Sequence, residues 1–289
     1  MKKYEKKFLN ISEQIKLLES RGLIIKNKKR LNFYLQHINY YHFSVYFKAF
    51  QDDCNNFKEN TNFEDILNIY NFDKKLRLLL LDALERIEIS VKAALSHEIT
   101  KKKNNLYWYL VENYNYRKNY EKIKDIILKS KGSMEIYICH FFSNYNDKSL
   151  PAWFFFESLS FGACVAIIKG LNNSDKQVLS NFYGLSKKNI QMLHHLSVLR
   201  NSCAHHSWTW NKNFTLKISL PSEYYNLFFH VNTKSLYSLV IFIRIFLIKI
   251  SPTSDWLDKL ESLIKNHNIE IRRMGFPENW RESLESIGS

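Results

Sequence analysis

The chain has 289 residues, of which 45% are hydrophobic, and this is enough to form one large or two small globular domains. It contains only 7 glycines and 4 prolines, and since turns between strands draw on both, the composition predicts long helices and few hairpins. The formal net charge of +14 attracts polyanions such as RNA, DNA or an anionic membrane surface. A lysine- and asparagine-rich composition can equally reflect genome base composition alone.

The cysteines and the apolar segments narrow the class of protein further. No C-x-x-C pair occurs, which argues against a zinc ribbon or a redox motif, and a chain of this size needs no disulfides, so we expect a reduced, cytoplasmic protein. The basic N-terminus has no apolar core typical of a signal peptide. The most apolar run, 235–250, is shorter than the ~20 residues that a bilayer requires and contains Arg244 and Lys249. We expect a buried helix there and no membrane partner.

Residues 1–60 are expected to form a helical N-terminal extension. A first helix over 10–23 has Ser12 as its candidate N-cap. The segment 31–50 suggests two short helices joined near Asn39. Its aromatic cluster is either core packing, which is the commoner use, or an RNA stacking platform; the cluster comprises Tyr40, Tyr41, Phe43, Tyr46 and Phe47.

Residues 61–289 are expected to form one helical domain that begins with a long amphipathic helix over 62–101. Arg86 and Glu88 are charged positions inside its pattern, and because residues two apart point to nearly opposite sides, at most one can face the apolar partner. A buried charge at either position needs a hydrogen-bonding partner. The apolar stripe runs through Leu76, Leu80, Ala83, Ile87, Val91 and Ala94.

The remaining segments give weaker signals. The basic, tyrosine-rich stretch 101–120 is either an exposed helix pair or an RNA-facing edge. Pro151 is expected to open a helix and Gly162 to mark a break or a close contact. Segment 213–221 alternates like a short strand, with an extended loop as the alternative. The tail 272–289 is expected to be irregular and anchored by Phe276 and Trp280.

The stretch VLRNSCAHHSWTWN contains the most informative polar cluster. Ser186 is the expected cap of the preceding helix, whose apolar face runs through Met192, Leu196, Leu199 and Cys203. Arg200 and His205 form an R-x4-H pattern. Asn201 lies four residues before His205 and shares its helix face, whereas Arg200 lies about 140° around the helix.

Such a trio suits RNA cleavage without a metal ion. His205 would transfer a proton to or from a ribose oxygen, Arg200 would hold the phosphate and Asn201 would orient either group. The residues themselves leave two alternatives open. One is an ordinary helix end whose basic residues complement the helix dipole. The other alternative is a zinc site, although the spacing of the candidate ligands matches no common zinc-binding pattern. These candidate ligands are Cys203, His205, His206, His194 and His195.

Five blocks in order resemble the Abi-like family of abortive-infection proteins, the AbiD/AbiF group, within the HEPN superfamily of helical ribonucleases. The likeness runs over most of the chain, and no single block would suffice. The blocks are SEQIKLLESRGLII with LNFYLQHINYYHFSVYFKAF, then IYNFDKKLRLLLLDALERIEISVKAAL, LPAWFFFESLSFGACVAII, LRNSCAHHSWTWN and MGFPENW.

This resemblance implies an all-α, HEPN-like helical bundle in which Arg200, Asn201 and His205 match the ribonuclease motif. Arg86 and Glu88 match charged positions of the family's second block and are expected to support the site. His206 directly follows the motif histidine and is a further supporting candidate, because either imidazole could reach the phosphate.

The resemblance also implies partners. We expect a homodimer, because the chain has one R-x4-H motif and two motifs commonly meet across a HEPN interface. RNA is the expected target, a small noncoding RNA is the expected restraint, and no metal or small-molecule cofactor is implied. The alternatives are a non-catalytic RNA-binding protein and a helical interaction scaffold.

Overall fold

The computed structural model describes residues 7–110, 120–132, 135–187, 189–214, 224 and 231–287. Among them every regular element is a helix, and pairing of extended segments is limited to two isolated bridges, Ile24 with Asn62 and Gln51 with Phe57. The all-α class predicted from the low glycine and proline content is confirmed. Residues 215–221 of the alternating segment and residues 111–119 of the tyrosine-rich stretch lie outside the described residues.

Backbone contacts divide the chain into two compact units. The first contains residues 1–76 and 262–269, and the second contains 77–261 and 270–289. Two helices contribute residues to both units, α4 (Phe63–Ala94) and α13 (Trp256–Asn266). The sequence predicts a domain boundary between residues 60 and 61. The two contact units are not the same thing as domains, so this boundary stays a prediction.

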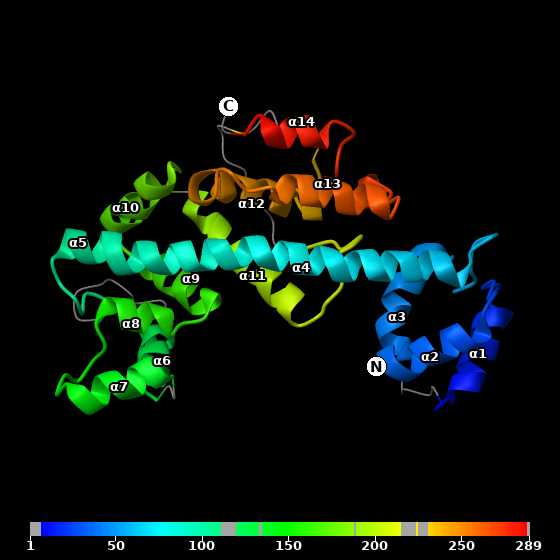
Figure 1. Cartoon of the computed structure of the whole chain (residues 1–289), viewed down its shortest axis with the longest axis horizontal. Coiled ribbons are helices and arrows are strands. Elements are labelled where there is room, and N and C mark those ends of the chain that lie inside the picture. The colour runs from blue at the N-terminus through cyan, green and yellow to red at the C-terminus, as the bar shows by residue number, and fades with distance from the viewer. Residues whose placement is uncertain are drawn as a thin grey trace. The chain divides into compact units, whose positions relative to one another are not determined.

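The first unit begins with a well-capped helix. Asn10, rather than Ser12, is the N-cap: its side chain accepts from the amide of Glu13, whose carboxylate accepts in return from the Asn10 amide. The prediction of Ser12 was wrong because this reciprocal pair lies two residues earlier. Asn39, at a φ of 66°, separates the next two helices as predicted. The helices are α1 (Ile11–Ser20), α2 (Lys28–Ile38), α3 (Tyr40–Phe47) and the 3₁₀ turn η1 (Lys48–Phe50) (Figure 1).

Aromatic packing forms the core of the first unit. Phe43, Tyr46 and Phe47 are buried, and the Tyr46 hydroxyl donates a 2.6 Å hydrogen bond to the buried carboxylate of Asp73. This bond satisfies the carboxylate, which would otherwise be costly to bury. Core packing therefore accounts for these three rings, whereas Tyr41 is 81% exposed.

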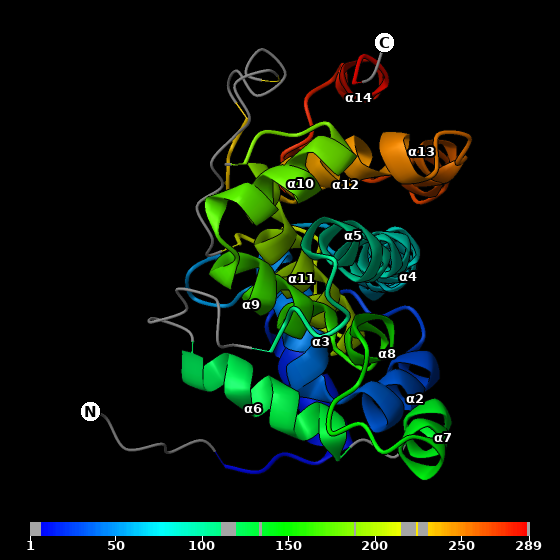
Figure 2. The same cartoon turned by 90° about the vertical axis from the view of Figure 1, so that its left-hand side faces the viewer.

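The second unit continues with the remainder of α4 and with shorter helices. Pro151 is the N-cap of α8, as predicted. Gly162 lies inside α9, and a Cβ added there would meet nothing within 4 Å, so the expected break or close contact was wrong. The elements are the π-helical turn η2 (Leu95–Ile99), α5 (Thr100–Lys103), α6 (Tyr120–Lys131), α7 (Ile136–Asn144), α8 (Ala152–Glu157), α9 (Phe161–Gly170), α10 (Asn173–Tyr183), η4 (Asn189–Gln191), α11 (Met192–Ala204), α12 (Leu236–Ile250), η6 (Ile271–Met274) and α14 (Trp280–Glu285) (Figures 1 and 2).

The apolar run near the C-terminus forms α12, whose residues from Leu236 to Ile243 are all buried. Its charged Arg244 donates from Nε to the carbonyl of Leu284 at 3.1 Å, which compensates for partial burial. None of the described helices combines the length and the hydropathy that crossing a bilayer requires. The predicted buried helix is confirmed.

The tail is more regular than expected. Phe276 and Trp280 are buried as predicted, but the segment contains η6 and α14. Arg281 ties α14 to α13 through Asp258, and it also pairs with Glu285 within α14. The turn before α14 needs Gly275, because its φ is 81° and a Cβ there would lie 2.3 Å from the Ser235 Cβ.

Candidate functional site

The apolar stripes of α4 and α11 position the polar cluster. Both stripes are buried as predicted, so the remaining sides of the two helices carry the polar residues. Ser186 accepts from the amide of Asn189 at 3.3 Å and thus begins the 3₁₀ turn η4 that leads into α11. The buried positions are Leu76, Leu80, Ala83, Ile87, Val91 and Ala94 in α4, and Met192, Leu196, Leu199 and Cys203 in α11.

The end of α11 fixes the two adjacent histidines in different backbone conformations. His205 is the C-cap residue, and the amide of His206 donates to the Cys203 carbonyl at 3.1 Å. The amide of Ser207 donates to the Ser202 carbonyl at 2.9 Å, which completes a Schellman motif. His206 has a φ of 58°, the left-handed position that usually holds glycine or asparagine. His206 thus terminates the helix, and both imidazoles are exposed.

A carboxylate on α4 holds the motif arginine. Glu88 Oε2 lies 3.2 Å from Arg200 Nε, and Glu88 Oε1 lies 3.3 Å from Lys92 Nζ. The Glu88 side chain is only 10% exposed, whereas that of Arg200 is 35% exposed. The buried carboxylate therefore has the partners that its position requires. Glu88 contacts Arg200 through Nε, so this contact does not occupy the two terminal nitrogens of the guanidinium.

A groove lies between α4 and the end of α11. Its volume is about 460 Å³, and Arg200 and Ala204 line it from α11 while Glu88, Ile89 and Lys92 line it from α4. Asn201 and His205 lie exposed on the same last turn rather than among the lining residues. Their side chains form no hydrogen bond or ion pair with the rest of the described chain. The helix end thus presents them to solvent beside the groove.

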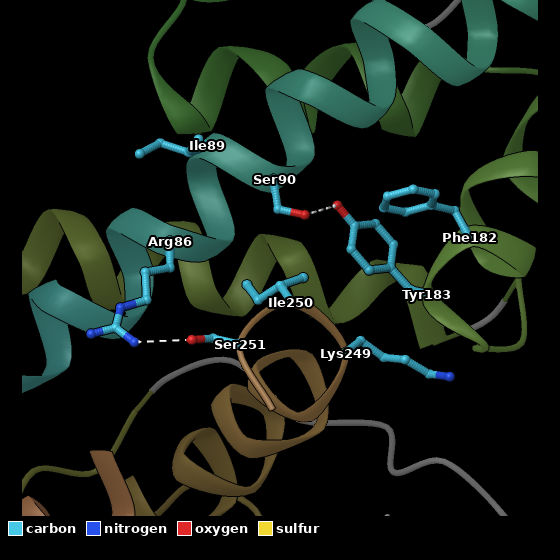
Figure 3. A pocket seen from close by; sticks show the side chains of 8 residues that line it. All are labelled: Arg86, Ile89, Ser90, Phe182, Tyr183, Lys249, Ile250 and Ser251. Atoms are coloured by element: carbon cyan, nitrogen blue, oxygen red, sulfur yellow. Dashed lines mark hydrogen bonds between the residues drawn. The ribbon is translucent and has the colours of Figure 1, made fainter. Parts of the chain in front are cut away.

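The structure does not bring Arg86 to this groove. Its guanidinium donates to Ser254 Oγ at 3.0 Å and to Ser251 Oγ at 3.2 Å, and it pairs with Asp82. These contacts turn it toward a second groove of about 760 Å³ between α4, α10 and the end of α12 (Figure 3). Glu88 reaches Arg200, and Arg86 does not.

The second groove also contains a tyrosine hydroxyl beside α4. Figure 3 shows Tyr183 pointing to Ser90, and their hydroxyl oxygens are 3.0 Å apart. Burial raises the pKa of Tyr183 far above its ordinary value, so this hydroxyl stays protonated and neutral. The contact therefore links α4 to α10 without carrying charge.

The candidate zinc ligands do not converge. Cys203 is buried on the apolar side of α11, whereas His205 and His206 are exposed beyond it. Within the described ranges, no three side chains of His, Cys, Asp or Glu come close enough to hold one metal ion. His194 and His195 lie near the other end of α11, on a different cavity.

Sequence reasoning missed Lys92 as part of this cluster. The available signal was its spacing of four residues after Glu88, which places both side chains on one helix face. Ile89 was also missed, although it is 55% exposed and lines both grooves on α4. The available signal was its place outside the predicted apolar stripe: Ile89 follows the stripe residue Ile87 by two positions, so the two side chains point to nearly opposite sides of α4.

Comparison with known proteins identifies a family. A family model described as Abi-like protein matches residues 33–211, which is more than half of the chain and includes Glu88 and the complete R-x4-H motif. Neither a curated protein nor a solved structure matches the chain.

Proposed function

The chain belongs to the Abi-like protein family, and from this premise we propose that it acts in phage defence as a metal-independent endoribonuclease of the HEPN type. One observation carries the proposal. Arg200 is anchored by a buried carboxylate at the edge of a groove, and His205 stands exposed at the end of the same helix.

Arg200 is the phosphate-binding residue. Since Glu88 contacts Nε, the terminal nitrogens can donate two parallel hydrogen bonds to a phosphate. Lys92 contacts the other oxygen of Glu88 and adds positive charge beside the groove. A guanidinium held in place before substrate binds needs little reorganisation to stabilise charge that develops on the phosphate.

His205 is the proton-transfer residue. The ribose 2′-oxygen attacks the adjacent phosphorus, the bond from phosphorus to the 5′-oxygen breaks, and the products are a 2′,3′-cyclic phosphate and a 5′-hydroxyl. The 2′-hydroxyl loses a proton and the leaving oxygen gains one, and His205 performs one of these transfers. Asn201, exposed on the same turn, orients the imidazole or a phosphate oxygen.

A second copy and RNA are the proposed partners. Ile89, Val198 and Trp208 expose apolar surface on or next to the helices that carry the motif, and burial of such surface favours association. Contact between two copies there would place two motifs together. The net charge of +14 suits both an RNA target and a restraining noncoding RNA.

The principal experiment measures cleavage of RNA by the purified protein in EDTA. We expect the wild type to cut, and His205→Ala to lose about 10²- to 10⁴-fold in rate, as removal of an acid–base group does. Because His205 is exposed, the variant should keep its fold and its RNA affinity.

His206→Asn is the matched control. Asparagine adopts the left-handed conformation of this position and removes only the imidazole, so cleavage should continue. Loss of cleavage in His206→Asn with retention in His205→Ala would reverse the assignment of the two histidines.

The substitution Arg200→Lys tests the phosphate-binding residue. A lysine keeps the charge but lacks the planar pair of donors, so we expect a large loss of cleavage. If neither the wild type nor any variant cuts, while all bind RNA with steep salt dependence, the protein is a non-catalytic RNA-binding protein instead. Absence of salt-sensitive RNA binding would favour the scaffold alternative.

A further inference from the structure

A separate cavity lies on another side of α11, within the second unit. Its volume is about 340 Å³, and residues of α9, α10, η4 and α11 line it; Figure 2 shows α9, α10 and α11 in the same part of the molecule. His194 lines this cavity and Arg200 lines the groove described above. His194 and Arg200 are six positions apart in the helix, which places them about 120° apart around α11. A ligand here would not occupy the proposed nuclease groove.

The lining of this cavity is strongly basic. Lys169, Lys176 and Lys187 line it, and no Asp or Glu of the described chain does. Asp175 is adjacent to Lys176 in sequence, but its buried carboxylate is paired with Lys102 and Lys103. Like charges around one cavity repel each other, so a bound anion stabilises the arrangement.

One of these lysines is held in place. Lys176 Nζ donates a 2.9 Å hydrogen bond to the carbonyl of Lys169 at the corner between α9 and α10. Desolvation by burial lowers the pKa of Lys176, as expected for an ammonium group that is partly removed from water. Because the hydrogen bond to Lys169 fixes the position of Nζ, an incoming phosphate would meet a positioned donor rather than a freely rotating side chain.

The rest of the cavity is apolar and aromatic. Val165, Ile168 and Ile190 are buried and contribute apolar surface. The rings of His194 and His195 stand edge to face, with centroids 5.9 Å apart, and also line the cavity. An apolar floor with flat rings suits a planar heterocycle, while the lysines suit its charged substituent.

We propose that this cavity binds a nucleoside monophosphate group. The phosphate contacts Lys176 and Lys187, and the base packs against the apolar floor and the two imidazole rings. The volume lies within the range of small-molecule sites. This site does not depend on the proposed nuclease activity. The ligand is either a free nucleotide or the 5′-phosphorylated end of an RNA.

Calorimetric titration of the full chain with AMP, adenosine and inorganic phosphate tests the site. AMP should bind, and each fragment should bind at least tenfold more weakly because it makes only part of the contacts. Lys176→Met and Lys187→Met should each weaken AMP binding about tenfold or more. Lys187 is exposed, so its variant should fold even if Lys176→Met does not.

Lys148→Met is the matched control, because Lys148 is an exposed lysine outside the cavity lining. It removes the same charge and should leave AMP binding unchanged. Absence of AMP binding, or equal binding by wild type and both cavity variants, would overturn the proposal.

Titration with 5′-phosphorylated and 5′-hydroxyl forms of one short RNA separates the two sources. The His205→Ala protein is used so that cleavage cannot consume the RNA. A 5′-phosphate preference that Lys187→Met removes identifies an RNA end, whereas binding of AMP without such a preference identifies a free nucleotide. These measurements report binding alone, so their failure leaves the nuclease proposal standing, and the reverse also holds.

Discussion

Arg86 and Glu88 lie two residues apart on α4, yet they serve different parts of the molecule. Glu88 is buried and contacts Arg200 and Lys92 at the candidate active site. Arg86 is partly exposed and contacts Asp82, Ser251 and Ser254 on the second groove. Two successive helical steps of about 100° separate their directions. Two charged residues that both match charged positions of a family pattern can therefore make their contacts at different sites.

The sharpest test of this difference is Glu88→Gln. The glutamine keeps the size of the side chain but weakens its attraction for Arg200 and Lys92, so Arg200 loses its fixed position. We expect RNA cleavage to fall roughly tenfold to a hundredfold, as when a partner that orients a functional side chain is lost. Glu85→Gln is the control, because Glu85 lines the same groove from an exposed position. If the two variants cleaved RNA at equal rates, Glu88 would have no role in positioning Arg200 for cleavage.

A double-mutant cycle between Glu88 and Arg200 measures their coupling. The carboxylate is largely buried, so we expect Glu88→Gln and Arg200→Gln to be coupled by about 1–3 kcal/mol in unfolding by urea. The charge-reversed pair Glu88→Arg with Arg200→Glu should recover part of this stability but no cleavage. Recovery of cleavage by the reversed pair would show that Arg200 does not bind phosphate.

Arg86→Ala should act on stability alone. It removes the hydrogen bonds to Ser251 and Ser254, which costs about 1 kcal/mol. Cleavage per folded molecule should stay at the wild-type rate. A selective loss of cleavage would restore Arg86 to the supporting role that the sequence predicted.

The smallest effect is expected for the pair of Asp82 and Arg86. Both side chains are more than a third exposed and lie four residues apart on one helix, so their coupling should be about 0.3–0.5 kcal/mol. The same unfolding assay gives this value. If the coupling free energy of Asp82 with Arg86 were as large as that of Glu88 with Arg200, the ion pairs on the two faces of α4 would contribute equally to stability.

The sequence predicted which helix faces are buried around the site better than it predicted the side-chain contacts at the site. The burial of Leu80, Ile87 and Leu196 follows from helical periodicity, which is local, and it was predicted correctly. The direction of Arg86 depends on Ser251 and Ser254, which lie 165 and 168 residues further along the chain, and no local pattern encodes that approach. The three lysines of the basic cavity come from separate segments, so their convergence was missed for the same reason.

Local sequence patterns also failed where two nearby residues suit the same role. Ser12 and Asn10 both suit a helix start, and the carboxylate of Glu13 decides between them. At the end of α11, the R-x4-H pattern does not distinguish His205 from His206 as the acting imidazole. The backbone bonds of the Schellman motif give the two residues different positions.

Asn39, with its positive φ, illustrates how a chain with so few glycines makes its reversals. Within the described residues, six asparagines adopt a positive φ, against three glycines. Asparagine tolerates this conformation because its short amide bonds to nearby backbone. It also has fewer conformations than glycine when unfolded, so each such reversal loses less chain entropy on folding. A glycine count alone therefore underestimates how many bends this sequence encodes.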